Sequence, residues 1–149
     1  MNFVNYLFGK NSNIINKVNF EDIQTTIKTN NKKILINTLD STKQNCLIKN
    51  TVLASNEETI IRKMIEKQQF DVYIIIYGEN CNQNKIYEKY NQLQNLGFYN
   101  IYLYVGGLFE WLCLQDIYGK EEFPTTIIEL DILKYKPVSC LNNLMLTMD

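Results

Sequence analysis

The stretch from Val72 to Trp111 constrains the fold of this chain more than any other part of the sequence. An apolar run, VYIIIY, is followed by a polar stretch, GENCNQN, and then by residues with helical spacing, KIYEKYNQLQNLGF. A second apolar run, NIYLY, and the residues GGLFEW complete the stretch. Unpaired backbone N–H groups converge where a buried strand ends in a loop at a helix N-terminus. We therefore expect the polar loop to be a potential anion-binding site.

Short apolar runs alternate with helix patterns along the rest of the chain. Asn19 is expected to cap a helix that runs to about residue 29, with Ile23 and Ile27 facing inward. Further strands are expected at 34–36, 51–53, 72–77 and 100–104, and further helices at 57–69, 84–96 and 108–118. Such alternation predicts an α/β fold with about five parallel strands and helices on both faces of the sheet.

Two patterns within Val72–Trp111 give more local expectations. The helix at 84–96 carries a single apolar stripe that should be buried against the sheet, made of Ile86, Tyr90, Leu93 and Leu96. Gly97 is expected to end this helix. The pair Gly106–Gly107 should make a tight turn near the polar loop, and Trp111 is expected to pack in the core.

The composition excludes several classes of function. The chain has no histidine, so it has neither a Cys–His nor a Ser–His pair and lacks the commonest zinc ligand. Its net charge of −1 gives no field that would attract nucleic acid or acidic membranes. The longest apolar run is far too short to span a bilayer, and the N-terminal residues carry no signal-peptide pattern. We expect a soluble cytoplasmic protein without nucleic-acid or membrane partners, and we expect no metal and no cofactor.

The four cysteines are widely and irregularly spaced, at Cys46, Cys81, Cys113 and Cys140. No CxxC motif occurs, which argues against a zinc site or a redox pair, and free thiols in a reducing compartment are favoured. Cys113 lies among apolar residues and is expected to fill the core. Cys46 and Cys140 have no partner that the sequence identifies. Cys81 alone lies in the polar loop.

The order of elements, closing with LGF…Y…GG…W, resembles the rhodanese family. The resemblance covers about residues 14–119 and implies a rhodanese-like domain at 1–119 with the strand order 1-5-4-2-3. Residues 120–149 form a tail outside it. In that family the sulfur-carrying cysteine opens the loop after the central strand. In this sequence the matching residue is Gly78, so the resemblance implies a rhodanese whose nucleophile is missing or moved.

Other positions depart from the family pattern as well. Where the family has an LIDVR-like pattern, Asn37 replaces the aspartate and Leu39 replaces the arginine, so the ion pair common in the family is lost. Leu47 replaces the histidine of the GHIPGAI-like pattern, and Gln83 replaces the basic residue or threonine that closes the loop. The loop length suits the sulfurtransferases, whereas the related phosphatases have a longer loop that ends in arginine.

The resemblance identifies the active-site loop with six residues, Gly78, Glu79, Asn80, Cys81, Asn82 and Gln83. Cys81 is the candidate catalytic residue, because a nearby helix N-terminus lowers the pKa of a thiol. The charge of Glu79 would oppose a thiolate there, and Lys85 would partly offset that charge. Two hypotheses follow. The chain is either a non-catalytic module that binds a protein partner or regulates one, or a sulfurtransferase or redox thiol protein that uses Cys81.

The tail, LQDIYGKEEFPTT and beyond, should end the last helix at Gly119 and turn at Pro124. The pattern FEWL…QDIYG…FPTT resembles that of degenerate rhodanese-like proteins of large DNA viruses and algae. For a viral protein this resemblance implies the host cytoplasm or the virion. The apolar residues of 131–133 and 144–146 should either pack back onto the domain or form a contact surface.

Overall fold

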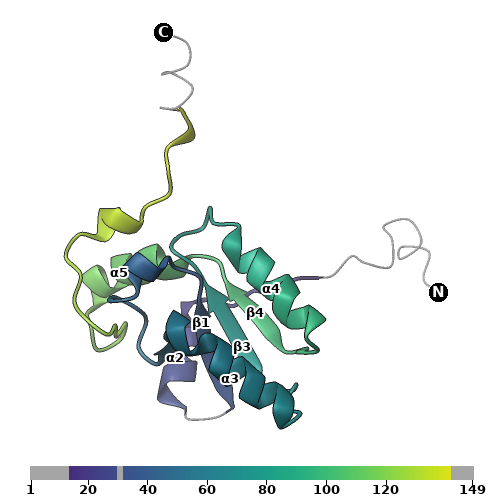
Figure 1. The fold of residues 1–149 in the computed structure, drawn as a ribbon. Coiled ribbons are helices and arrows are strands. Elements are labelled where there is room, and N and C mark those ends of the chain that lie inside the picture. The colour runs from purple at the N-terminus through teal and green to yellow at the C-terminus, as the bar shows by residue number, and fades with distance from the viewer. Residues whose placement is uncertain (1–13, 30–31, 142–149) are drawn as a thin grey trace.

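The computed structural model describes residues 14–29 and 32–141, and Figure 1 shows a twisted parallel sheet with helices on both faces. Within these residues the sheet has four strands in the order β2-β1-β3-β4. Their bounds are Lys33–Asn37 for β1, Thr51–Val52 for β2, Tyr73–Tyr77 for β3 and Ile101–Tyr104 for β4. The predicted α/β class is therefore confirmed. All three strand pairs are parallel, so the carboxyl ends of the strands meet at one edge of the sheet.

A first strand, which the order 1-5-4-2-3 requires, is reduced in the described residues to a single parallel bridge between Lys17 and Leu103. Val18 N–H donates to the Leu103 carbonyl, and Leu103 N–H donates to the Asn16 carbonyl, both at 2.9 Å. This bridge lies against β4, so the chain follows the order 1-5-4-2-3 that the resemblance implies. This pairing cannot extend beyond Val18 because Asn19 already caps the next helix.

In the described part of the chain four helices cover the sheet: α2 (Phe20–Lys28), α3 (Ala54–Glu66), α4 (Lys85–Asn95) and α5 (Gly107–Tyr118). Two short 3₁₀ turns, η1 (Ser41–Lys43) and η2 (Ile132–Tyr135), follow β1 and α5 respectively. One core cluster contains residues of α2 and α5, and the other contains residues of α3 and α4. The helix predicted at 57–69 begins and ends three residues earlier, and it cannot continue to 69 because Gln68 takes a left-handed backbone conformation (φ 55°).

The start of α2 matches the sequence prediction. The Asn19 side chain accepts the N–H groups of Glu21 and Asp22, and the Asp22 carboxylate accepts the Asn19 N–H in return. This reciprocal capping box satisfies N–H groups that have no partner within the helix. Ile23 is fully buried as expected, whereas Ile27 is only partly buried.

The apolar stripe of α4 is confirmed for Ile86, Tyr90 and Leu93, which are buried, but the prediction for Leu96 is wrong. Leu96 is 48% exposed. The helix has already ended there. Gly97, with φ at 110°, donates to the Gln94 carbonyl, and Phe98 donates to the Leu93 carbonyl. This Schellman turn places Phe98, not Leu96, in the core beside Leu93.

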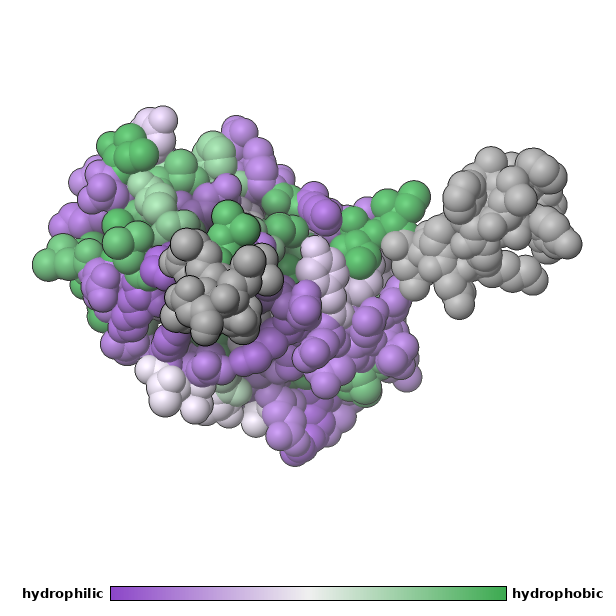
Figure 2. Space-filling model, turned by 90° about the horizontal axis from the view of Figure 1, so that it is seen from above, coloured by the Kyte–Doolittle hydropathy of each residue, from purple (hydrophilic) through white to green (hydrophobic). Residues whose placement is uncertain are grey.

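The tail packs back onto the domain as far as η2. Phe123 and Tyr135 are buried in the cluster that contains Trp111, whose Nε1–H donates to the Pro124 carbonyl at 3.2 Å. Trp111 is thus a core residue, as predicted. Ile132 contacts the same cluster while Leu133 points outward, and residues 144–146 lie outside the described residues. Figure 2 shows apolar side chains on the surface at this end of the molecule.

No helix within the described ranges, 14–29 and 32–141, is long and apolar enough to cross a membrane.

Candidate functional site

The loop at residues 78–84 leaves the carboxyl end of β3 and leads into α4. The N-terminus of α5 packs directly onto it. Leu108 N–H donates to the Gly78 carbonyl and Phe109 N–H donates to the Glu79 carbonyl, each at 2.9 Å. Two of the N–H groups that have no partner within α5 are therefore satisfied by the carbonyls of the loop.

The turn before α5 requires glycine at Gly107. Its φ is +68°, and a Cβ atom there would lie 2.6 Å from the Gly78 carbonyl oxygen. Both the backbone conformation and the close approach exclude a side chain. The predicted tight turn near the loop is confirmed, and it holds α5 against Gly78.

Gly78 itself is surrounded by side chains. A Cβ atom at Gly78 would lie 3.0 Å from Thr38 Oγ1, 3.1 Å from Ile86 Cγ2 and 3.3 Å from Gln83 Oε1. Its φ lies outside the left-handed region, so a side chain here is restricted by the neighbouring side chains and not by backbone conformation. The position that the resemblance assigns to the sulfur carrier is therefore enclosed by neighbouring groups.

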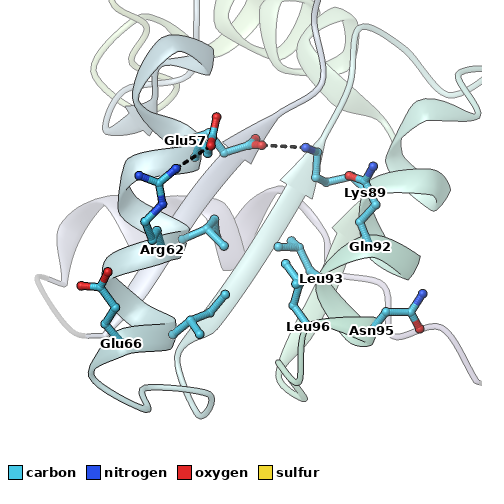
Figure 3. Close-up of a pocket in the computed structure, with 11 residues that line it drawn as sticks. Glu57, Arg62, Glu66, Lys89, Gln92, Leu93, Asn95 and Leu96 are labelled. Atoms are coloured by element: carbon cyan, nitrogen blue, oxygen red, sulfur yellow. Dashed lines mark hydrogen bonds and ion pairs between the residues drawn. The ribbon is translucent and has the colours of Figure 1, made fainter.

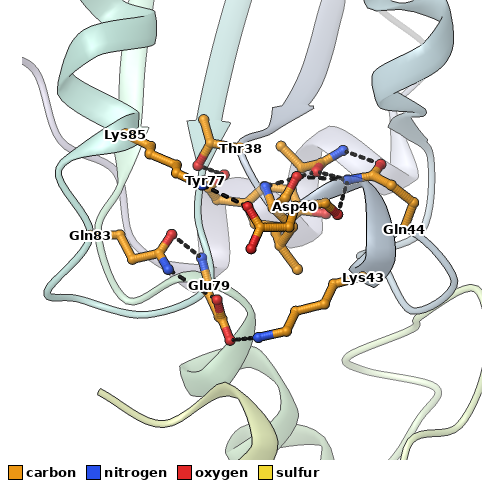
Figure 4. Close-up of polar contacts among 10 residues, drawn as sticks. Thr38, Asp40, Lys43, Gln44, Tyr77, Glu79, Gln83 and Lys85 are labelled. Atoms are coloured by element: carbon orange, nitrogen blue, oxygen red, sulfur yellow. Dashed lines mark hydrogen bonds and ion pairs between the residues drawn. The ribbon is translucent and has the colours of Figure 1, made fainter. Parts of the chain in front are cut away.

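Glu79 is the charged residue at the centre of the loop (Figure 4). Its side chain is 11% exposed and accepts hydrogen bonds from Lys43 Nζ and, at 3.0 Å, from Gln83 Nε2. Gln83 Oε1 also accepts the Glu79 N–H at 3.4 Å. Gln83, in the position that closes the loop, thus binds both the backbone and the carboxylate of Glu79.

Lys43, not Lys85, neutralises Glu79 directly. Lys85 forms an exposed ion pair with Asp40 at 2.7 Å, and this pair lowers the pKa of Asp40 and raises the pKa of Lys85. Lys43 was not predicted as a site residue. A usable signal existed, since Lys43 follows β1, the strand that pairs with β3, and the carboxyl ends of neighbouring parallel strands meet at one edge.

The tail reaches the same loop. Asn80 is buried, and its Nδ2 donates to the Tyr135 carbonyl at 3.0 Å, while its Oδ1 accepts the Asn82 N–H at 3.0 Å. Lys43 Nζ lies 5.9 Å from the centre of the Tyr135 ring. η2 therefore packs against the loop and against the cation that binds Glu79. No sequence signal pointed to Tyr135 as a neighbour of the loop.

Cys81 is exposed at the outer side of the loop, and its Sγ lies 3.8 Å from Asn82 Oδ1. Among the described residues no backbone N–H is bonded to this sulfur. Cys46 is buried and Cys140 is exposed. Cys113 is half-buried and outside both core clusters, so the prediction of a core filler is wrong, because that face of α5 is only partly covered. Within the described ranges no cluster of three potential metal ligands occurs.

The residues on and after β1 that depart from the family pattern carry no charge. Asn37 Nδ2 donates to Gln44 Oε1 at 3.1 Å and to the Val52 carbonyl at 3.0 Å, and Gln44 Nε2 donates back to Asn37 Oδ1 at 2.7 Å. Leu39 and Leu47 are buried in the core. An amide pair and two apolar residues thus stand where the resemblance implies an ion pair and a histidine.

Comparisons with known proteins identify the fold. No protein-family model matches the sequence, and no curated protein matches it. Twelve chains of known structure match this one in three dimensions. One is the rhodanese-like domain of an Anabaena protein (TM-score 0.52, 19% identity, covering 83% of this chain and 86% of that domain).

Two other matches have different names. A yeast protein tyrosine phosphatase of the rhodanese family has a TM-score of 0.51 and 14% identity, covering 76% of this chain and 94% of the yeast chain. The As-Sb reductase of Leishmania major has a TM-score of 0.53 and 14% identity, covering 91% of this chain and 99% of that enzyme. The fold of this chain is therefore rhodanese-like. At these identities the likeness shows the fold alone, and the neighbours' different activities leave the chemistry to be argued from the loop.

Proposed function

We propose that this chain is a rhodanese-like module without the family's sulfur-transfer chemistry, acting as a non-catalytic binding or regulatory protein. The observation that carries the proposal is the filled loop. Gly78 offers no nucleophile, and its surroundings are occupied by Thr38, Ile86 and Gln83. The one charged side chain of the loop is the carboxylate of Glu79, held by Lys43 and Gln83.

The electrostatics of the loop support the same conclusion. Thiosulfate and persulfides are anions, and a loop that binds them needs open N–H groups or a cation. Here the Glu79 N–H bonds to Gln83 and the Asn82 N–H bonds to Asn80. The nearest cation, Lys43, is already paired with Glu79. Two N–H groups of the loop and its nearest cation are therefore already bonded within the protein.

The surface of the tail supports a protein partner. Ile128, Leu130 and Leu133 are exposed on and beside η2, at the end of the molecule where the loop lies. Exposed apolar side chains that cluster in this way are typical of protein interaction sites. The tail pattern also supports a place among the degenerate rhodanese-like proteins of viruses and algae, acting in the cytoplasm and without nucleic-acid or membrane partners.

The second candidate function is a sulfurtransferase or redox thiol protein that uses Cys81. One observation favours it, since Cys81 is exposed and thus accessible to a sulfur donor. Against it, the sulfur lies beside the amide of Asn82 and not within a group of N–H donors. We therefore rank it below the non-catalytic module.

A sulfur-transfer assay on the full chain separates the two functions. Thiosulfate serves as donor and cyanide as acceptor, and thiocyanate is measured. The non-catalytic module predicts no turnover above that of the heat-denatured protein. Turnover that is lost in Cys81→Ser and kept in Cys140→Ser, the matched exposed cysteine, would establish the enzyme and overturn the proposal.

A further inference from the structure

A groove of about 590 Å³ runs between α3 and α4, on the face of the molecule away from α2 and α5 (Figure 3). Its apolar lining comes from both helices: Ile61, Ile65, Leu93 and Leu96. The ion pair between Lys89 and Glu57, at 2.6 Å, joins the two helices at one end. Glu66 and Leu96 lie at the other end.

The walls of this groove are incompletely covered. Leu93 and Ile61 are buried at its floor, but Leu96 is nearly half exposed above them. An exposed leucine beside an apolar floor indicates a surface that a second apolar surface would cover, with a gain from the area removed from water. The groove volume is also within the range of sites that accept apolar side chains or ligands.

The charges along the groove are unbalanced. Glu57 pairs with Lys89 and Glu58 pairs with Arg62, but among the described residues no cation pairs with Glu66. Three carboxylates and two cations line the groove, so its lining carries a net charge of −1. The occupant that fits is therefore an apolar segment that also carries a positive charge.

We propose that the groove receives residues 3–8 of this same chain, with Lys10 near Glu66. Residues 1–13 lie outside the described residues. Their sequence places four apolar residues at a spacing that puts them on one face of a helix: Phe3, Val4, Leu7 and Phe8. Lys10 is the one charged residue among residues 1–13, so the segment carries the charge that complements the groove.

A short polar stretch connects the segment to the described chain. The described chain begins at Ile14, and Ile15 packs in the core cluster that contains Ile61 and Leu93. The polar residues 9–13 (GKNSN) join Ile14 to the apolar segment. Five extended residues reach about 17 Å. The segment is thus tethered within this reach of a residue that packs in the same core cluster as the groove floor.

The inference does not depend on the proposed function. It concerns the face of α3 and α4, whereas the proposed function rests on the loop after β3. A docked segment would bury Leu96 and occupy the groove, so any other ligand would have to displace it.

Amide hydrogen exchange on the full chain tests the proposal. In the unmodified protein the amides of residues 3–8 should exchange at least about tenfold more slowly than in an unstructured peptide of the same sequence. Leu7→Asn and Leu96→Asn should each remove this protection, one from each side of the contact. Tyr6→Asn is the matched control, because residue 6 falls on the opposite face of the same helix and should leave protection unchanged.

Three results would overturn the proposal. In the first, residues 3–8 of the unmodified protein exchange at the rates of an unstructured peptide. In the second, they remain protected in Leu96→Asn and therefore dock elsewhere. In the third, protection disappears on dilution while sedimentation shows a dimer, which would make the occupant a second copy. Leu96 is exposed, so its replacement should not unfold the domain, and circular dichroism confirms this for each variant.

Discussion

Lys43 Nζ forms an ion pair with the carboxylate of Glu79 and so joins η1 to the loop that follows β3. The carboxylate is mostly withdrawn from water and receives a second hydrogen bond from Gln83. A negative charge is thereby fixed next to Gly78, where the resemblance to rhodaneses implies a cysteine that handles anionic sulfur. The negative charge of Glu79 is thus balanced by Lys43, a residue of the protein itself.

The replacement Lys43→Met should destabilise the domain by about 1–3 kcal/mol, because it leaves the Glu79 carboxylate largely buried without its cation. Urea unfolding followed by circular dichroism measures the loss. Lys85→Met is the matched control. Its ion pair with Asp40 is exposed to solvent, so the loss should be much smaller. Equal losses in the two variants would contradict the role given to Lys43.

Tyr77, the last residue of β3, should contribute through its hydroxyl group. The hydroxyl oxygen accepts the Ile48 N–H at 3.1 Å and bonds to Thr51 Oγ1 at 2.8 Å, and the ring is fully buried. Burial also raises the pKa of Tyr77 above its ordinary value. Tyr77→Phe should cost about 1–3 kcal/mol in free energy of unfolding, because the Ile48 N–H is left buried and unpaired.

The control for Tyr77 lies on the same strand. Tyr73 is substantially exposed, and its ring stacks on Tyr102, a contact that phenylalanine keeps. Tyr73→Phe should change stability by less than about 0.5 kcal/mol. A Tyr77→Phe protein as stable as the Tyr73→Phe protein would show that the hydroxyl bonds of Tyr77 contribute nothing.

The apolar stripe of α4 gives a third test. Leu93 is 3% exposed, so Leu93→Ala should cost roughly 2–5 kcal/mol, a large share of the stability of a domain this size. Leu96→Ala, at the exposed end of the same helix, should cost much less. Thermal or urea unfolding measures both. A loss below about 0.5 kcal/mol for Leu93→Ala would mean that this face of α4 does not pack on the sheet.

Most of the fold was predictable because local patterns and tertiary packing agree. Asn19 caps α2 as predicted, and the buried runs of β1 and β3 pair in the expected parallel manner. Leu96 was predicted wrongly because helical spacing says nothing about where a helix ends. The turn at Gly97 decided that position, and it moved Phe98 into the core instead.

The candidate site was predictable only as a segment. The loop and its six residues follow from the strand, the polar stretch and the helix, and Gly107 packs on Gly78 as the glycine pair suggests. The partners of the loop were not predictable in the same way. Lys43 and Tyr135 lie 36 and 55 residues from the loop residues they contact, and only the tertiary fold brings them there.

The order in which the four thiols react follows from their burial. Burial raises the pKa values of Cys46 and Cys113, so at neutral pH they have less of the reactive thiolate than an ordinary cysteine. Iodoacetamide should modify the exposed Cys81 and Cys140 first, Cys113 more slowly, and Cys46 only after unfolding. Because raised pKa values keep these two thiols protonated, the rate at which iodoacetamide modifies Cys113 should still rise with pH in the mildly alkaline range. Peptide mass spectrometry measures each rate, and labelling of Cys46 as fast as Cys81 would contradict this order.

The most direct test of the central claim is the sulfur load of the native protein. The folded chain is treated with thiosulfate or polysulfide, and intact and peptide mass spectrometry then locate any added sulfur atom. With Gly78 in place of the sulfur carrier and Glu79 fixed beside it, we predict no persulfide on Cys81 above the level found on Cys140, the other exposed cysteine. A persulfide that forms on Cys81 alone, and only while the protein is folded, would contradict the account and show that the loop still carries sulfur.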